Sequence, residues 1–509
     1  MQNDICHFKS WHDILKKNSQ EYKEKIFIES IDQDKNITFA EMYKWSNKVA
    51  NLLEKIELRK SDKVTLIGKN SIETIILYFG ILNYGAILNP IFFEESDENL
   101  FRIVNLTKPS LVFYDSDRSL GKTGKETAIW MSFPDFFKNC DSDNQFIKII
   151  NNQSDKFEDC RGNSEDIAEI LYTSGTTTVP KGILISREAL FLMADEISER
   201  IGLADNDRVL EYRAYSWASA QLLTILSSML KGSTLFLGKK FSISRFSNWL
   251  KDYDITISAG VPAVLNMMIN GSVSLNKRDV PSLKFITSSS APLPEETHRR
   301  FEEMYGIKIN QMMGMSEAGW MAGNPPSNQR FGSVGLPLKY KKIHFIKNNG
   351  TKCCNCENGE MVVAGKSIGM GYLGEDGGLV EFPKEGFATG DLGYADDDGY
   401  IFITGRAKDL IIRGGINISP LEISSRIMEH PAVNEAIIIG VPDNIYGEEV
   451  VGFVTQKDGF KISEKELIDH CKACLPDFKI PKKIYFLSSL PRNQNGKVIK
   501  SELIKVIDT

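Results

Sequence analysis

YTSGTTTVPKG, the stretch Tyr172–Gly182, combines a glycine, a run of hydroxyl side chains and a lysine. Backbone N–H groups, hydroxyls and a mobile ammonium are the groups that wrap a polyphosphate. The common nucleotide loop G-x-x-x-x-G-K-[ST] does not fit, because Pro180 stands where its second glycine belongs and Gly182 follows Lys181. From these residues alone, another kind of phosphate loop and a plain Ser/Thr-rich turn both remain open.

The loop lies in a half of the chain where apolar strand-like runs alternate with amphipathic helical patterns. The strand-like run Ile167–Thr173 precedes it, and a helix is expected from Arg187. Further strands are expected at Lys63–Gly68, Ser110–Asp115, Ser233–Gly238 and Leu283–Ser290, and helices at Glu41–Ile56, Ser186–Ile201 and Pro294–Met304. This alternation predicts α/β layers with a largely parallel sheet.

The second half has a different pattern. After about Gly332, short strands and Gly/Asp turns predict a small antiparallel barrel or sheet. From about Lys408 we expect a compact α+β tail made of a helix, two strands, a helix and a strand, at Leu421–His430, Asn434–Val441, Glu449–Thr455, Ser463–Leu475 and Lys483–Leu487. The segment before it, ITGRAKDLIIRGG, is polar and glycine-bearing, which is typical of a hinge.

Composition narrows the class of protein. The 509 residues, 42% of them hydrophobic, are enough for two or more domains, and the net charge of −6 argues against nucleic acid as a partner. The apolar run Thr74–Phe93 has the length of a membrane span, but Asn83, Asn89 and Pro90 interrupt it. We therefore expect a buried helix followed by a buried strand, and no membrane span.

Cysteine usage indicates a reducing compartment. Eight cysteines in a chain of this length do not make a disulfide framework. Two pairs, Cys353/Cys356 and Cys471/Cys474, have the spacing of zinc ligands, but they lie far apart and the second falls in a helical pattern, so packing is the preferred interpretation. Neither the N-terminal residues nor the final KVIDT carries a targeting signal, so a cytoplasmic location is expected.

Three other short stretches carry polar groups that suit nucleotide chemistry. Glu317, in MGMSE, could hold Mg²⁺, a cation that prefers carboxylate and phosphate oxygens. Asp391, in TGD, could accept hydrogen bonds from both hydroxyls of a ribose. Lys497 closes the polar loop PRNQNGK near the chain end. Each of these residues, taken singly, fits an ordinary turn equally well.

Taken in order, YTSGTTTVPKG, GMSE, TGD, GRAKDLIIRGG and PRNQNGKV closely resemble the motifs of the adenylate-forming superfamily. That superfamily comprises acyl- and aryl-CoA synthetases, adenylation domains and firefly luciferase, and this chain is most similar to the acyl-CoA ligases. The resemblance extends from Ile37 to Lys497. It implies an α/β fold with a large N-terminal domain, residues 1–407, of two layered, mostly parallel sheets plus a small β-barrel. A small mobile α+β domain, residues 408–509, follows it.

The resemblance also implies roles for single residues. Lys497, Glu317 and Lys181 would be catalytic, with Glu317 binding Mg²⁺ and Lys408 at the hinge. The nucleotide and the pantetheine arm would contact Thr173, Ser174, Gly175, Thr176, Thr177, Thr178, Met313, Gly314, Ser316, Asp391, Arg406, Gly414 and Gly415. In the family, a carboxylate attacks the α-phosphate of ATP, and a thiol then attacks the acyl-AMP after the small domain has rotated. Such chemistry needs charge neutralisation more than proton transfer.

The acid would lie between the segments Tyr212–Gln221, Ser288–Pro292 and Gln311–Met321. Its pocket residues are expected to be Trp217, Ser288, Met312, Met315 and Trp320. Their apolar and adaptable side chains favour a hydrophobic or aromatic carboxylate, although each could be ordinary core. Arg213 could pair with a second carboxylate, or serve the structure alone.

Three departures from the family pattern are Thr178, Met313 and the pair Ser289-Ser290, where most relatives have glycine, an aromatic residue, and Gly-Ala or Gly-Gly, respectively.

Taken as a whole, the resemblance implies an ATP-dependent acyl- or aryl-CoA ligase that uses Mg²⁺ and coenzyme A. One alternative loads the acyl group onto the phosphopantetheine of a separate acyl carrier protein. Another is an inactive ligand-binding member. A homodimer is possible.

Overall fold

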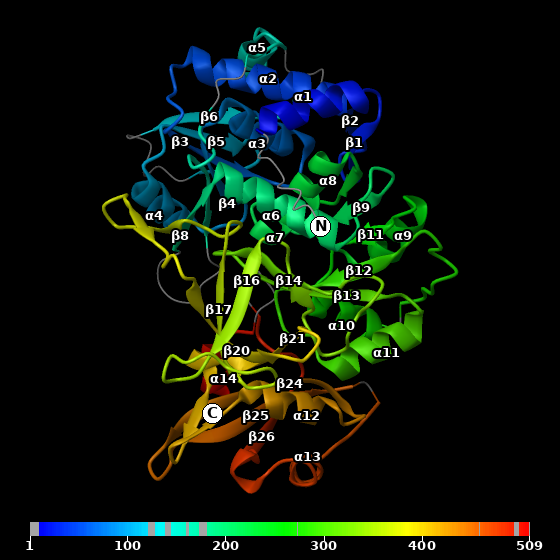
Figure 1. Ribbon diagram of the computed structural model, residues 1–509. Coiled ribbons are helices and arrows are strands. Elements are labelled where there is room, and N and C mark those ends of the chain that lie inside the picture. The colour runs from blue at the N-terminus through cyan, green and yellow to red at the C-terminus, as the bar shows by residue number, and fades with distance from the viewer. Residues whose placement is uncertain are drawn as a thin grey trace.

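The structure is a computed structural model that describes residues 10–120, 128–137, 144–158, 162–172, 181–271, 273–457, 459–492 and 498–507. Two large sheets and their helices form one body, and a smaller sheet with three helices lies beneath it (Figure 1). The α/β class with a large N-terminal and a smaller C-terminal domain, predicted from the sequence, is confirmed.

The first sheet has nine strands. They lie in the order β15 (Leu336–Pro337), β14 (Gly319–Gly323), β13 (Ile309–Met315), β12 (Phe285–Ser288), β11 (Ile257–Ser258), β9 (Arg208–Glu211), β10 (Thr234–Leu237), β1 (Ile26–Ser30) and β2 (Lys35–Thr38). From β13 to β1 every pair is parallel, so the carboxyl ends of β9, β11 and β12 share one edge. Polar segments that follow these strands are thereby brought together.

The second sheet has eight strands. They lie in the order β19 (Leu379–Glu381), β18 (Gly371–Leu373), β8 (Gly182–Ser186), β7 (Ile167–Tyr172), β4 (Ile87–Phe92), β3 (Lys63–Gly68), β5 (Leu111–Asp115) and β6 (Ile129–Phe133). The half from β7 to β6 is parallel, whereas β8, β18 and β19 are antiparallel. The strand that precedes the 173–180 loop therefore pairs with the strand that follows it.

Helices fill the space between the sheets and cover their outer faces. They are α1 (Trp11–Glu21), α2 (Phe39–Lys55), α3 (Ile72–Tyr84), α4 (Asp97–Thr107), α5 (Gln145–Asn151), α6 (Arg187–Arg200), α7 (Ala218–Ala220), α8 (Leu226–Lys231), α9 (Ile243–Asp252), α10 (Pro262–Asn270) and α11 (Glu295–Tyr305), with a π-helix, η1 (Gln221–Ile225), between α7 and α8. The largest apolar cluster joins α2, α3, α6 and α8 to strands of both sheets, and a second lies under α9, α10 and α11.

The apolar run at 74–93 forms α3 followed by β4, as predicted. Every residue of α3 is buried, because the helix lies in the core between other elements and is apolar all round. Gly85 ends it with a φ of 89°, a left-handed conformation that glycine adopts without strain. Among the residues that the structure describes, no helix is long and apolar enough to cross a membrane.

A four-stranded antiparallel sheet follows, in the order β16 (Lys341–Ile346), β17 (Gly359–Gly365), β20 (Phe387–Ala395) and β21 (Ile401–Arg406). Its own apolar cluster includes Phe345, Met361 and Val363. The expected change to short antiparallel strands is confirmed. A buried ion pair of 2.6 Å between Lys341 and Glu196 joins this sheet to α6.

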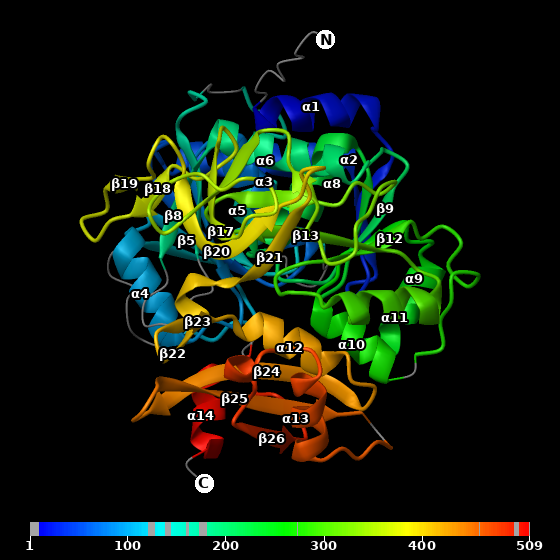
Figure 2. The ribbon, with the colours of Figure 1, turned by 60° about the horizontal axis from the view of Figure 1, so that its bottom comes forward.

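The last sheet has the order β23 (Ile416–Ile418), β22 (Ile411–Arg413), β25 (Gly447–Gln456) and β24 (Val433–Asp443), with β26 (Lys483–Leu487) parallel to β25. Its helices are α12 (Pro420–Met428), α13 (Glu464–Lys472) and α14 (Lys500–Ile507), with the short turns η2 (Ala407–Asp409) and η3 (Asp477–Lys479). This sheet lies below α10 and α11 in two views (Figures 1 and 2). The predicted tail is confirmed, while β22, β23 and α14 were not predicted.

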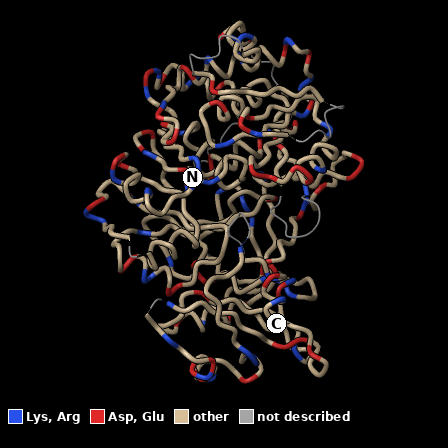
Figure 3. Tube along the Cα trace, turned by 180° about the vertical axis from the view of Figure 1, so that it is seen from behind, with Lys and Arg blue, Asp and Glu red and all other residues tan. Residues whose placement is uncertain are grey.

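Charged residues of both signs are interspersed over the surface (Figure 3). Within the described ranges, no group of three or more His, Cys, Asp or Glu side chains could hold a metal ion. Cys471 is buried in the core of the last sheet, and burial raises the pKa of its thiol to about 11. That thiol therefore packs as a small apolar group.

Candidate active site

Glu317 and Lys181, both predicted from the sequence, meet at Tyr372 in the second sheet. The hydroxyl of Tyr372 donates a 3.0 Å hydrogen bond to Oε1 of Glu317. The ammonium of Lys181 lies 5.2 Å from the centre of the Tyr372 ring, a cation–π contact. Glu317 is buried, and its backbone oxygen accepts a 2.7 Å hydrogen bond from the N–H of Gly369. A buried carboxylate and a lysine thus flank one tyrosine.

Strand pairing explains this meeting. Tyr372 lies in β18 and is paired with Ile183 of β8. Ile183 follows Lys181 by two residues, so the pairing brings Lys181 close to Tyr372. Glu317 lies in the turn between β13 and β14, at the edge where the parallel strands end. The Tyr372 ring is held edge-on against Phe382 at 5.0 Å. Burial, and then the charge of Glu317, raises the pKa of the Tyr372 phenol, so its hydroxyl stays a donor at neutral pH.

The two residues predicted to bind the ribose, Asp391 and Arg406, lie side by side. Asp391 in β20 stands opposite Arg406 in β21, and Nε of Arg406 donates a 2.8 Å hydrogen bond to Oδ1 of the carboxylate. Asp391 is buried, whereas the Arg406 side chain is half exposed. Burial raises the pKa of Asp391, and Arg406 partly offsets that rise. Gly390, with a φ of 76°, turns the chain immediately before this carboxylate.

The predicted hinge and thiol-side residues lie directly after this pair. Lys408 is exposed in the short turn η2 between β21 and β22. Gly414 and Gly415 form the tip of the β22–β23 hairpin, with φ values of 58° and 82° that favour glycine. Ile412 beside them is 53% exposed, which leaves apolar surface next to the hairpin tip. Such a surface can cover another part of a protein.

The first acid segment follows β9 and leads into the π-helix. Trp217 is partly exposed, and its ring lies 6.3 Å from that of Phe92. Arg213 is buried and forms an ion pair of 2.6 Å with the buried Glu211. Thr224 of η1 also donates to Glu211, at 2.9 Å. The charge of Arg213 is therefore already balanced by the chain itself.

The other acid segments contribute both buried and accessible side chains. Ser288 and Gln311 are partners across β12 and β13, and both are buried. Met312 and Trp320 are only 2% and 3% exposed and belong to the main apolar core. Met315 is partly exposed. Met313, Gly314 and Ser316, expected near the nucleotide, lie in and just after the end of β13 and are at least partly accessible.

A buried carboxyl in β7 lies close to the start of the 173–180 loop. Oε2 of Glu169 accepts a 3.4 Å hydrogen bond from the hydroxyl of Tyr78. Burial raises the pKa of Glu169 to about 8, although Gln221 of the π-helix and Tyr78 act in the opposite direction. The side chain is therefore mostly protonated at neutral pH. Its hydrogen bond joins the strand before residues 173–180 to Tyr78 of α3.

Some predicted residues lie outside the residues that the structure describes. These are Thr173, Ser174, Gly175, Thr176, Thr177 and Thr178 of the loop, and Lys497. Sequence reasoning missed Tyr372 and Glu169. The sequence carried a signal for Tyr372, because the glycines that flank it in GMGYLG are typical of strands whose backbones approach closely. For Glu169 the only signal was an acidic residue within an otherwise apolar strand.

Comparison with known proteins finds AMP-binding enzymes and CoA ligases. The family model described as AMP-binding enzyme matches residues 15–373, and that of the AMP-binding enzyme C-terminal domain matches residues 422–497. A 2-succinylbenzoate–CoA ligase of Geobacillus sp. (strain WCH70) is 30% identical over 92% of each chain. A sulfoacetate–CoA ligase of Cupriavidus necator is 29% identical over 95% of each. The crystal structure of ATP-bound MatB from Rhodopseudomonas palustris superimposes with a TM-score of 0.90 at 26% identity, covering 98% of this chain and 99% of that one.

Proposed function

The chain belongs to the AMP-binding enzyme family, an adenylate-forming group of AMP-forming acid–thiol ligases, and on that premise we propose how its residues divide the reaction. The observation that supports the proposal most is the contact of Tyr372 with both Lys181 and Glu317. Glu317, which we propose binds Mg²⁺, and Lys181, which we propose binds the phosphates, thus contact one side chain. An ordinary turn at each of the two motifs would not require them to meet.

The residues present fit ATP and Mg²⁺. Glu317 offers the hard carboxylate oxygen that Mg²⁺ prefers, within a buried site where Tyr372 orients it. When bound, Mg²⁺ would neutralise charge on the phosphates. Asp391, held by Arg406, presents an acceptor for the ribose hydroxyls, and we assign Met313, near the end of β13, to the base. Thr173–Thr178 and Ser316 would surround the phosphates, with Lys181 as the mobile charge.

The first half-reaction needs a positioned cation more than a general base. The attacking carboxylate is already ionised, and negative charge spreads over the α-phosphate as pyrophosphate leaves. We assign that cation to Lys497. In the second half-reaction the sulfur of a thiol attacks the acyl carbonyl carbon, the thiol proton is lost, and AMP leaves with the electrons of the broken bond. We place the Gly414–Gly415 hairpin over the pantetheine arm in this step.

We place the domain boundary between residues 407 and 408, with Lys408 as the hinge. Support comes from the change of sheet there, because β21 closes one sheet and β22 opens the next. The exposed apolar side chains near the hairpin tip, such as Ile412, would be covered when the small domain rotates.

For the acid we propose a hydrophobic or aromatic carboxylate. Trp217 with Phe92, and the partly exposed Met315, supply apolar surface beside the site. Arg213 is bound by Glu211, so it has no net charge to offer a second carboxylate. A second candidate is an acid with another anionic group. This second candidate has some support, because Nη1 of Arg213 is buried with no hydrogen-bond partner among the described residues and is therefore open to donate to an anion. In addition, two relatives are named for sulfoacetate and 2-succinylbenzoate.

We propose CoA as the thiol, and a carrier-protein phosphopantetheine as the alternative. The described cysteines are free thiols, which supports a cytoplasmic setting. The deciding experiment measures pyrophosphate release over a panel of acids that includes benzoates, fatty acids and sulfonated or dicarboxylic acids, with and without CoA. We expect release with an apolar acid and thioester formation with CoA. Absence of release with every acid would rule out the ligase, and release without a thioester would favour a carrier protein.

A further inference from the structure

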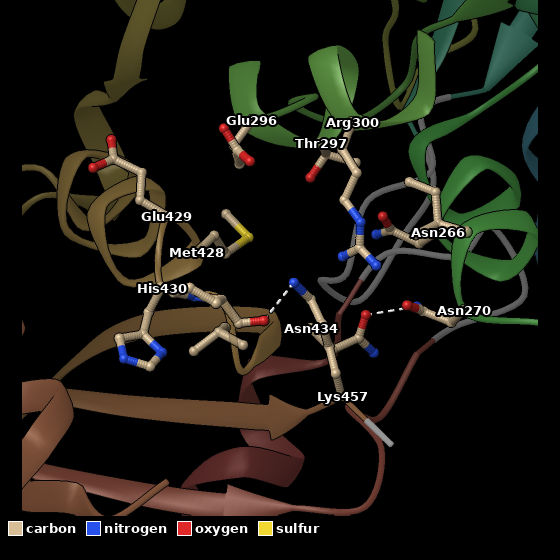
Figure 4. Close-up of a pocket in the computed structure, with 13 residues that line it drawn as sticks. Asn266, Asn270, Glu296, Thr297, Arg300, Met428, Glu429, His430, Asn434 and Lys457 are labelled. Carbon is tan, nitrogen blue, oxygen red and sulfur yellow. Dashed lines mark hydrogen bonds between the residues drawn. The ribbon is translucent and has the colours of Figure 1, made fainter. Parts of the chain in front are cut away.

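A cavity of about 210 Å³ lies between the large body and the last sheet (Figure 4), and no residue of the cluster around Tyr372 lines it. Its walls come from α10 and α11 on one side and from the end of α12 and strands β24 and β25 on the other. A hydrogen bond of 2.6 Å crosses the boundary at its rim, from Nδ2 of Asn270 to Oδ1 of Asn434. The cavity therefore exists only while the two domains hold this arrangement.

Two cations from different domains point into this space. Arg300 reaches down from α11 and Lys457 reaches up from the end of β25, and their charged groups point toward one another (Figure 4). Arg300 has no hydrogen bond or ion pair with any of the described residues. Lys457 donates a 2.7 Å hydrogen bond to the backbone oxygen of Pro431 and is otherwise without an anionic partner in the described chain. Burial, and then the charge of Arg300, lowers the pKa of Lys457.

The acids around the cavity offset the charge of this pair only in part, and none forms an ion pair with either cation among the described residues. Glu429 is engaged by Arg426 at 2.7 Å. Glu296 lies one turn before Arg300 on α11 and also lines the cavity, and its charge raises the pKa of Lys457, so it offsets part of the repulsion. Burial lowers the pKa of the His430 ring, so the ring adds no acid to the cavity and its charged form is disfavoured. Two like charges that share a partly buried space repel each other, so the arrangement lacks an anion.

We infer that this cavity binds a small oxyanion, of the size and charge of inorganic phosphate, between Arg300 and Lys457. The two cations supply charge-assisted hydrogen bonds, and Asn266 and Thr297 on the same wall supply uncharged donors. Because the ligand touches both domains, it favours the arrangement seen here over any in which the small domain has moved.

The binding itself does not rest on the proposed function, but its consequence does. If the small domain rotates between the two half-reactions, one of them uses the arrangement seen here and the other needs a different one. Phosphate then slows the half-reaction that needs the different arrangement, and it leaves the half-reaction that uses this arrangement nearly unchanged. Phosphate is a hydrolysis product of the pyrophosphate that the reaction releases. Occupancy of the cavity would therefore rise as the reaction proceeds and the released pyrophosphate is hydrolysed.

The test uses the full chain without ATP, acid or CoA, so it gives a result even if the protein has no ligase activity. Calorimetric and thermal-unfolding titrations with sodium phosphate are compared with sodium chloride at equal ionic strength. We expect saturable binding and a rise in Tm with phosphate alone. Arg300→Gln and Lys457→Gln should each weaken binding at least about tenfold. Lys465→Gln removes an exposed charge of the same domain and should leave binding unchanged.

Two outcomes would overturn the inference. Equal binding by wild type and both cavity variants would mean that phosphate occupies another site or binds as an adventitious ion only. A rise in the KM for CoA, but not for dephospho-CoA, in Arg300→Gln with unchanged phosphate binding would assign the cations to a phosphate of CoA. Among the residues that the structure describes, neither Arg300 nor Lys457 forms a hydrogen bond with a side chain, so both variants are expected to fold.

Discussion

Replacing Tyr372 by phenylalanine isolates one hydrogen bond in the candidate active site. The variant loses the phenol oxygen that donates to Glu317 at 3.0 Å, but it keeps the ring beneath Lys181 and the edge contact with Phe382. A hydrogen bond to a charged group contributes about 1.5–3 kcal/mol. Loss of a residue that orients a metal ligand lowers metal affinity about 10–100-fold. We therefore expect the Mg²⁺ concentration for half-maximal activity to rise at least about tenfold.

The assay is pyrophosphate release at saturating ATP and acid, titrated with Mg²⁺. At saturating Mg²⁺ we expect kcat to recover most of its wild-type value, because the carboxylate itself remains. Tyr372→Leu removes the ring as well, and should add a rise in the KM for ATP of about two- to fivefold from the lost cation–π contact. Thermal unfolding of both variants shows whether either change also lowers stability.

A matched control is Tyr340→Phe, which removes a similar bond of 3.1 Å to Asp195, a residue that forms no hydrogen bond with Glu317 or Lys181 in the described part of the chain. It should leave the Mg²⁺ dependence unchanged. The reasoning would be refuted if Tyr372→Phe bound Mg²⁺ as wild type does, or if it lost activity and stability together with no change in the Mg²⁺ titration. In the second case Tyr372 would serve packing alone.

Three other changes have clear expected results. Lys341→Met leaves Glu196 buried without its cation and should lower the free energy of unfolding, measured with a denaturant, by about 3–5 kcal/mol. Adding Glu196→Gln should restore part of that loss. An unchanged free energy of unfolding in Lys341→Met would contradict a stabilising role for the buried pair. Burial raises the pKa of Glu169 from 4.5 to about 8, so the folded chain holds a proton that the unfolded chain releases, and stability should fall as pH rises between these values. Glu169→Gln should flatten that slope in unfolding experiments at pH 5 and 8, and parallel profiles would exclude it. Lys497→Ala should abolish adenylation but spare thioester formation from supplied acyl-AMP; equal loss of both would argue against a rotating domain.

Local signals account for the parts of the fold that were predicted well. Thr38 and Glu41 form a capping box at the start of α2, and the apolar spacing that follows matches a helix face. Gly85 separates α3 from β4 because its conformation ends the helix. The strand predicted at Lys483–Leu487 has the same bounds in the structure. In each case the residues that set the element lie within it.

The contacts of the candidate site are not local in this sense. Tyr372 reaches Glu317 and Lys181 only because β18 pairs with β8, a strand that lies far back in the chain. β18 has three residues, too few for a periodic pattern to show which strand it joins. The motif gave Glu317 and Lys181 through resemblance, but the residue that connects them depends on sheet order.

The acid segments show why residue type alone does not identify a pocket wall. Met312 and Trp320 were expected beside the acid, yet they lie in paired strands whose side chains enter the main core, while Trp217 and Met315 keep accessible surface. Strand alternation sends neighbouring side chains to opposite faces, and a one-residue difference in position therefore separates core from site. Arg213 illustrates the same limit for charge: from the sequence it could pair with a second carboxylate or serve the structure alone, and in the structure it forms an ion pair with Glu211. Specificity for the acid should consequently depend on Trp217 and Met315 more than on the residues buried behind them.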